Sequence, residues 1–211
     1  MGTSIEDRGF ISYLEDCAVQ AGFKTRVLDI GDIGTSGSGP FVDLENARIE
    51  MLFKLYPWEW MFADPFGKSL SLFETRFLEP PWKAVLSNKG ILPLLWEMAP
   101  GHPNLLPSYF EDQPERHKLN GNYVRKPLYS REGENIVLVL NGKARESTGG
   151  SYGREGCIWQ QLTPLPAFDG RYPVVGSWIV GSEPCGIGIR EDTSPITKNT
   201  SRFVPHAILP S

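Results

Sequence analysis

The chain has 211 residues, of which 40% are hydrophobic and 22% are charged, and its formal net charge is −4. This apolar fraction supplies a packed core and excludes an intrinsically disordered chain. The acidic balance, with a sequence pI near 5.5, argues against a dedicated nucleic-acid-binding protein, which would carry an excess of lysine and arginine.

The first part of the chain has the pattern of an α/β layer. Apolar residues recur at positions 10, 13, 14, 17 and 18, a spacing that predicts a helix with one buried face. Gly22 stands where the C-cap glycine of that helix is expected. Residues 25–30 have the pattern of a strand, and a glycine- and serine-rich loop follows over 31–39. Pro57 should end any helix that begins near Asn46.

A second helix is predicted after Ser87, which can cap it. Its buried face would consist of Ile91, Leu94, Leu95 and Met98, and the polar segment 101–121 has the composition of a linker or surface loop. Strands are then predicted, with glycine-rich turns between them, over residues 123–128, 135–140, 157–162, 172–180 and 185–189. The chain therefore divides into an α/β part, residues 1–85, and a strand-rich, mainly antiparallel part, residues 86–211.

The cysteines and the N-terminus indicate the compartment. Cys17, Cys157 and Cys185 form no CxxC pair or Cys/His cluster, which argues against a disulfide framework and a structural zinc site. Charged residues at 6–8 stand where a signal peptide would be apolar, and apolar runs such as 136–140 are too short to span a bilayer. We therefore expect a soluble, cytoplasmic protein with no nucleic-acid and no membrane partner.

Two lysines are candidates for binding phosphate. Lys126 lies near the end of a predicted strand, and a loop containing Gly133 follows it. A lysine is a compact charge suited to phosphate oxygens, and a glycine loop can close over phosphates with its N–H groups. A β-hairpin with a solvated basic edge fits the same pattern. Lys89, at the predicted helix start, favours an anion there, although an exposed first-turn lysine is equally compatible.

Two further segments carry polar groups at strand ends. Gln160 and Gln161 offer amide donors and acceptors that can recognise the edge of an adenine ring, with Trp159 and Leu162 as an apolar wall. The alternative interpretation is an ordinary surface pair. Arg190, beside carboxylates and a polar loop, can stabilise a developing phosphate charge, or can belong to a solvated loop with internal ion pairs.

Taken in order, these segments resemble the glutathionylspermidine synthase family of ATP-grasp carboxylate–amine ligases. The resemblance covers nearly the whole chain, and residues 123–127 (Tyr-Val-Arg-Lys-Pro) and 186–192 (Gly-Ile-Gly-Ile-Arg-Glu-Asp) belong to it. The other matching segments are residues 13–17, 21–22, 52–61, 79–82, 86–96, 102–103, 176–178 and 202–206. It implies an α+β, ATP-grasp-like fold, with residues 1–85 as the pre-ATP-grasp-like region and residues 86–211 as the nucleotide-binding region.

The resemblance also implies roles for individual residues. Lys89 and Lys126 look like the two nucleotide-binding lysines, and Gln160 and Gln161 look like the adenine-binding strand. Arg190 looks like the catalytic arginine that stabilises an acylphosphate. The loop that covers the phosphates would consist of Ser130, Arg131, Glu132 and Gly133, with Glu132 reaching a magnesium ion. Phosphoryl transfer needs such charge neutralisation and positioning more than covalent chemistry.

One departure from the family affects the expected activity. The principal magnesium ligands of the family lie on a motif of the form E-Y-N-A-D-T, which this sequence lacks, and residues 43–46 do not replace it. We therefore expect the C-terminal part of a ligase that uses ATP and Mg²⁺, with glutathione and spermidine as the substrates that the resemblance implies. The alternative is a nucleotide-binding or scaffold protein without ligase turnover.

Overall fold

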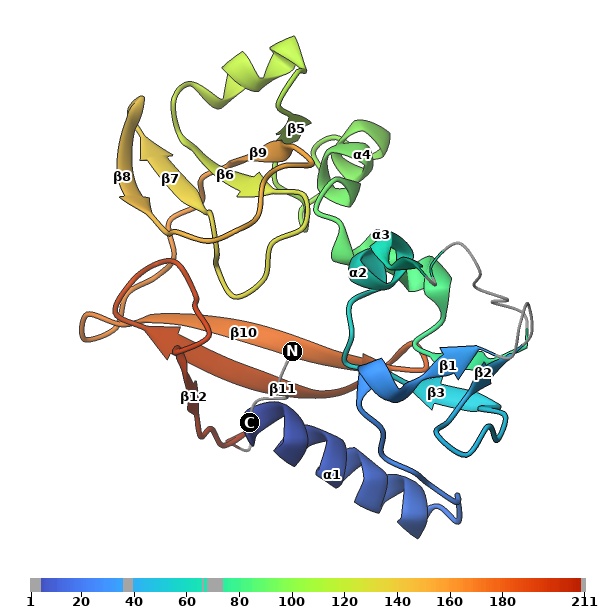
Figure 1. The fold of residues 1–211 in the computed structure, drawn as a ribbon. Helices are drawn as coiled ribbons and strands as arrows, with labels where there is room; N and C mark the ends of the chain where they lie inside the picture. The colour runs from blue at the N-terminus through green and yellow to red at the C-terminus, as the bar shows by residue number, and fades with distance from the viewer. Residues whose placement is uncertain (1–4, 36–39, 66, 68–73, 210–211) are drawn as a thin grey trace. The chain divides into compact units, whose positions relative to one another are not determined.

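The computed structural model describes residues 5–35, 40–65, 67 and 74–209, and its elements are labelled in Figure 1. Helices and mainly antiparallel strands alternate along the chain, which confirms the predicted α+β class. The chain divides into two compact units, Met1–Val85 and Leu86–Ser211. Among the described residues, no helix combines the length and the apolar character that a membrane crossing requires.

The first unit is built from short elements around a small aromatic core. Two strand pairs, β1 with β2 (antiparallel) and β3 with β4 (parallel), surround the buried side chains of Phe41, Trp58, Met61 and Phe77. The ring centroids of Trp58 and Phe77 lie 4.8 Å apart in an edge-to-face arrangement. The elements are α1 (Ile5–Gln20), η1 (Ile30–Asp32), β1 (Gly34–Thr35), β2 (Phe41–Val42), β3 (Met51–Phe53), α2 (Trp58–Ala63), β4 (Arg76–Leu78) and η3 (Pro81–Lys83), followed by α3 (Ala84–Ser87) at the boundary.

Helix α1 confirms the predicted helix and its glycine cap but not its buried face. Gly22, with φ +85°, donates its N–H to the Val19 carbonyl while Phe23 donates to the Ala18 carbonyl, which is the Schellman pattern. Tyr13, expected to be buried, is 66% exposed, and α1 has no buried residue. The strand predicted over 25–30 is wrong, because residues 25–29 form no ladder and η1 begins at Ile30.

The second unit contains a five-stranded antiparallel sheet in the order β5-β9-β6-β7-β8. Its elements are α4 (Ile91–Met98), β5 (Ser108–Phe110), η4 (Pro114–Leu119), β6 (Tyr123–Pro127), β7 (Val137–Leu140), β8 (Lys143–Ser147) and β9 (Cys157–Gln161). Strand β9 lies between β5 and β6, so its backbone is paired on both sides, and Ile158 on it is completely buried. Three of the predicted strands therefore form the centre of this sheet.

Three sequence expectations in the first part of this unit are wrong. Ser87 ends α3 rather than capping the next helix, and Gly90 precedes α4. The buried residue of α4 is Pro93, whereas Met98 of the predicted face is 80% exposed. The segment 101–121 is not only a loop, because it contains β5 and η4.

A second antiparallel sheet of this unit consists of β10 (Tyr172–Val180), β11 (Glu183–Asp192) and β12 (Arg202–Val204). A two-residue turn with positive φ at Gly181 and Ser182 joins the two long strands, as hairpin turns of the primed types require. Both strands predicted here are confirmed, and β11 is longer than predicted.

Candidate functional site

Lys126 is the most distinctive charged residue of the five-stranded sheet. Its Nζ donates a hydrogen bond of 2.7 Å to Oε1 of Gln160 on the adjacent strand β9. Because Lys126 pairs with Ile158 and Val124 pairs with Gln160, the two side chains are diagonal neighbours on one face of the sheet. Burial lowers the pKa of Lys126. The described residues give this desolvated ammonium one neutral acceptor, which leaves donors for an anionic ligand.

Gln160 has both ends of its amide engaged inside the protein. Its Nε2 donates to Oγ of Ser108 at 3.1 Å, and the Ser108 hydroxyl donates to the Leu106 carbonyl at 2.9 Å. Gln161 has an exposed side chain, and its backbone N–H donates to the Pro107 carbonyl at 2.8 Å. A contact between the Gln160 amide and adenine would have to replace these bonds, so the role predicted for the two glutamines stays a prediction.

Lys89 lies in the turn before α4, where its backbone and side chain both contact the segment that follows β6. The backbone N–H donates to the Leu128 carbonyl at 2.9 Å, and Nζ donates to the Ser130 carbonyl at 2.5 Å. Gly90 is buried at this crossing, where a Cβ would lie 3.2 Å from the Phe110 ring. The structure therefore brings Lys89 to the predicted phosphate-covering loop.

The loop itself has a defined conformation. Glu132 and Gly133 both have positive φ, +53° and +72°, which is the left-handed region that favours glycine. Thr148 braces the loop, because its Oγ1 donates to the Gly133 carbonyl and accepts the N–H of Ile136. A Cβ on Gly133 would collide with the carbonyl oxygen of Thr197, so the loop packs closely against the segment after β11. Arg131 and Glu132 are exposed at its tip.

The donor set for magnesium is small. Within the part of the chain that the structure describes, no three His, Cys, Asp or Glu residues gather as a metal-binding group. Glu132 can supply one carboxylate from the exposed tip of the loop. Magnesium in nucleotide sites takes one or two carboxylates and completes its shell with phosphate oxygens and water. A single carboxylate beside bound phosphates therefore fits the ion.

Arg190, on β11, organises the loop that follows its strand. One nitrogen, Nη2, donates to the carbonyls of Lys198, Asn199 and Ser201 at 2.5, 3.3 and 3.4 Å. Its Nε is buried and has no hydrogen-bond partner among the described residues. These bonds hold the segment 198–201 in place, so the hydrogen bonds of the Arg190 guanidinium go to backbone carbonyls of its own chain.

Asp192 braces the same loop. It accepts hydrogen bonds from the Ser201 hydroxyl at 2.6 Å and the Ser194 N–H at 3.0 Å, and these bonds hold the pKa of Asp192 below its usual value. Ser194 also donates to Glu146 on β8. Together with the close approach of Thr197 to Gly133, this contact brings the loop after Arg190 against residues 130–133, the predicted phosphate-covering loop.

The opposite face of the sheet carries Trp159, predicted as part of an apolar wall beside the glutamines, together with residues that the sequence analysis did not single out. Arg125 donates to Glu111 at 2.9 Å, and this bond raises the pKa of Arg125. The rings of Tyr123 and Trp159 stack at 4.0 Å, with the Arg116 guanidinium 4.7 Å from the Trp159 ring. Because successive side chains of a strand point to opposite faces of the sheet, this cluster lies on the face opposite to Lys126 and Gln160.

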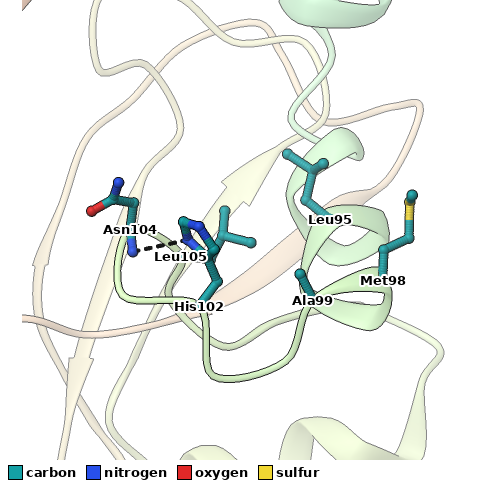
Figure 2. Close-up of a pocket in the computed structure, with 6 residues that line it drawn as sticks. All are labelled: Leu95, Met98, Ala99, His102, Asn104 and Leu105. Carbon is teal, nitrogen blue, oxygen red and sulfur yellow. Dashed lines mark hydrogen bonds between the residues drawn. The ribbon is translucent and has the colours of Figure 1, made fainter.

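An open pocket of about 400 Å³ lies elsewhere in the second unit, between α4 and the turn that follows it (Figure 2). Its lining is mainly apolar, and the Asn104 N–H donates to Nδ1 of His102 at 3.2 Å. Its lining residues are Leu95, Met98, Ala99, His102, Asn104 and Leu105. The residues predicted for the nucleotide site do not line it, and it has no charged carboxylate, lysine or arginine for phosphoryl chemistry.

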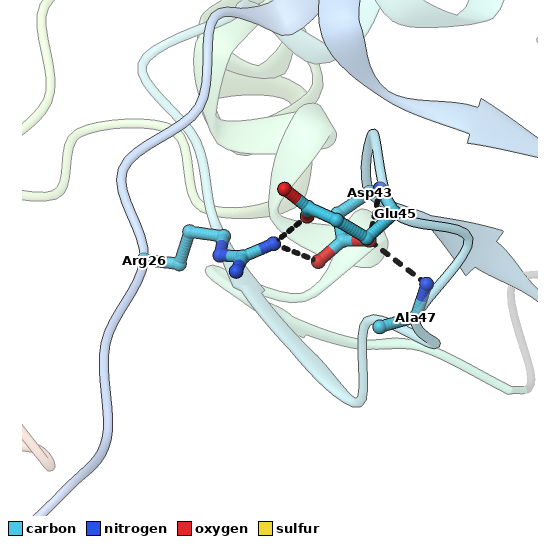
Figure 3. Close-up of polar contacts among 4 residues, drawn as sticks. All are labelled: Arg26, Asp43, Glu45 and Ala47. Atoms are coloured by element: carbon cyan, nitrogen blue, oxygen red, sulfur yellow. Dashed lines mark hydrogen bonds and ion pairs between the residues drawn. The ribbon is translucent and has the colours of Figure 1, made fainter.

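The acidic segment that follows β2 forms an ion-pair cluster in the first unit (Figure 3). Arg26 pairs with Asp43 at 2.5 Å and also with Glu45. Burial would raise the pKa of Asp43, but the N–H groups of Ala47 and Glu45 and the charge of Arg26 outweigh it and lower that pKa. These carboxylates therefore stabilise the turn that follows β2.

The order of helices and mainly antiparallel strands, together with the family model, gives the class of the protein, which is α+β with an ATP-grasp-like fold. The family model described as glutathionylspermidine synthase preATP-grasp matches residues 1–209. The chain therefore belongs to this family of ligases, which confirms the resemblance found in the sequence.

Relatives with assigned names agree with the family. A Haemophilus influenzae protein named as an acid–amine ligase is 45% identical over 97% of this chain and 54% of its own length. Trypanothione synthetase of Crithidia fasciculata is 30% identical, with 78% and 28% of the two chains covered. The bifunctional glutathionylspermidine synthetase/amidase of Escherichia coli is 30% identical, with 95% and 36% covered. The chain thus spans about half the length of the first relative and about a third of the other two.

Proposed function

We propose that this chain contributes the nucleotide-binding part of an ATP-dependent carboxylate–amine ligase. The observation that carries the proposal is the half-buried ammonium of Lys126, which burial destabilises and which has a neutral amide as its protein partner. A bound phosphate would compensate this desolvated charge. The names of the relatives, an acid–amine ligase and a glutathionylspermidine synthetase, support the ligase activity.

In this proposal Lys126 and Lys89 bind phosphate oxygens of ATP from two sides of the loop that follows β6. Lys89 already contacts the Ser130 carbonyl, so its ammonium lies at the base of the loop. Arg131 and the backbone N–H groups around Gly133 cover the phosphates, and Gln161 and the backbone beyond β9 contact the adenine. Magnesium, held by Glu132 and the phosphates, would neutralise part of their charge.

The proposed reaction joins a carboxylate to an amine in two displacements. A carboxylate oxygen attacks the γ-phosphorus of ATP, the bond to the bridging oxygen breaks, and ADP leaves. The amine nitrogen then attacks the acyl carbon of the acylphosphate, loses a proton, and releases phosphate as the amide forms. Arg190 would stabilise the transferred phosphoryl group by exchanging carbonyls of residues 198–201 for phosphate oxygens. Glutathione and spermidine are the first substrates to test.

Mg²⁺-dependent ADP formation in the presence of glutathione and spermidine tests the proposal in a protein that joins this chain to the remaining part of a relative, because the sequence lacks the metal-binding motif of the family. We expect ADP release that requires both Mg²⁺ and the carboxylate substrate, and we expect Arg190→Lys to lower turnover more than ATP affinity, because a planar guanidinium is lost. Arg145→Lys, on the exposed part of β8, is the matched control. ATP binding without ADP formation would contradict the ligase and favour a nucleotide-binding protein without turnover.

A further inference from the structure

We propose that Ser108 and Gln160 are positioning residues that orient the Lys126 ammonium toward its anionic ligand, through a chain of hydrogen bonds that begins at the Leu106 carbonyl. The proposal rests on the function proposed above and deepens it. It changes the role of Gln160 from a direct adenine contact to a residue that acts through Lys126.

The three side chains come from three adjacent strands. In the register of the sheet, Ser108 on β5 lies directly opposite Gln160 on β9, and Lys126 on β6 is the diagonal neighbour of Gln160. All three therefore lie on the same face, in a row across β5, β9 and β6. The row places a buried hydroxyl at one end and the ammonium at the other.

The donor and acceptor roles fix the direction of the chain. A serine hydroxyl has one proton, and Ser108 donates it to the Leu106 carbonyl, so its Oγ can only accept from Gln160. The Gln160 amide must then present Nε2 to Ser108 and Oε1 to Lys126. Ser108 is 1% exposed and Gln160 9% exposed, so water competes little for these bonds. A flexible lysine is thereby held in one orientation before the ligand binds, which lowers the entropy cost of binding.

The charged groups on neighbouring elements have partners of their own. Lys89 donates to Ser130, Arg125 pairs with Glu111 on the opposite face, and Glu146 accepts from Ser194. Burial is the cause of the lowered pKa of Lys126. Because Oε1 of Gln160 accepts a hydrogen bond from the charged ammonium, removing this oxygen should lower the pKa of Lys126 further.

The test combines Mg·ATP calorimetry with ¹³Cε NMR titration of Lys126, whose signal is assigned by its loss in Lys126→Met. Gln160→Met and Ser108→Ala should lower the pKa of Lys126 and weaken Mg·ATP binding about three- to tenfold, the effect of one hydrogen bond. Gln160→Glu, which places a carboxylate beside the ammonium, should raise that pKa instead. Ser147→Ala, in the exposed part of β8, should change neither quantity.

The outcomes separate this inference from the proposed function. If Lys126→Ala weakens Mg·ATP binding while Gln160→Met and Ser108→Ala leave both the affinity and the Lys126 pKa unchanged, the positioning role is wrong and the nucleotide site stands. If Lys126→Ala leaves Mg·ATP binding unchanged, the site is not a nucleotide site and both proposals fail. Opposite pKa shifts in Gln160→Met and Gln160→Glu would be the signature of a direct contact, which a purely structural role would not produce.

Discussion

The two sheets of the second unit differ in how their strands are used. In the five-stranded sheet, short strands bury Ile158 completely and hold a row of polar side chains between them. In the three-stranded sheet, β10 and β11 pair over their whole length, yet Trp178 is 64% exposed and Val175 is also exposed. Backbone pairing alone therefore does not bury side chains. Lys126 and Gln160 lie on the two central strands β6 and β9, which pair with a strand on each side, and there the hydrogen bonds between side chains hold them in one orientation.

The largest expected effect comes from removing the buried centre of the five-stranded sheet. Ile158→Ala should lower the free energy of unfolding by about 2–5 kcal/mol, since it leaves a cavity at a completely buried position. The same substitution on the other sheet, Ile187→Ala, should cost at most about 1 kcal/mol, because that side chain is exposed. Urea unfolding of both variants measures the difference. Equal losses of unfolding free energy in the two variants would mean that the two sheets are equally packed, which would contradict the difference in burial between them.

A smaller difference between a variant and its matched control, about 1–3 kcal/mol, is expected at the loop that contains Gly133. Gly133→Ala should be destabilised by its left-handed backbone, at about 1–2 kcal/mol, and further by the collision with the Thr197 carbonyl, at about 1–3 kcal/mol. Gly142→Ala is the matched control, because its φ is +71° and no atom lies within 4 Å of its Cβ. Thermal unfolding that gives the same loss for both variants would show that the Thr197 segment does not pack on the loop.

The smallest of these effects concerns the loop after Arg190. Asp192→Asn should lower stability by about 1 kcal/mol near pH 7, because the amide keeps one acceptor oxygen and loses one of the two hydrogen bonds from Ser201 and Ser194, together with the negative charge. Since the pKa of Asp192 is lowered in the folded state, this contribution is present above the unfolded value of about 3.9 and is lost as the pH falls through the folded pKa.

The difference between Asp192→Asn and the unsubstituted protein should therefore shrink below about pH 4. Urea unfolding at several pH values between 3 and 7 measures it, with exposed Asp112→Asn as the control. A difference that does not change with pH would contradict the carboxylate's role.

Much of the second unit could be predicted from the sequence, and the reason is local. Alternating apolar residues and glycine turns mark β6, β7, β9, β10 and β11, and the pairing of β10 with β11 follows from the short turn between them. Strand β5 could not be predicted, because three residues in a polar, proline-containing segment become a strand only by pairing with β9. Residues 25–29 show the reverse, since a strand-like pattern without a partner stays irregular.

The site follows the same division between local and tertiary information. The candidate residues could be named from sequence motifs alone. The hydrogen bond from Lys89 to the Ser130 carbonyl agrees with the prediction that this lysine and the loop 130–133 belong to one site. The bond between Lys126 and Gln160 depends on the register of two strands that are 34 positions apart, which no local pattern contains. Ser108 could not be found at all, because its strand was expected to be a loop.

The central claim, that Lys126 binds the phosphates of ATP, is tested most directly by calorimetric titration of the chain with Mg·ATP. The account predicts binding that Lys126→Ala weakens roughly ten- to hundredfold, the effect of losing a charge-assisted hydrogen bond, while Lys143→Ala on the exposed strand β8 leaves it unchanged. Equal affinities in the unsubstituted protein and in Lys126→Ala would contradict the account.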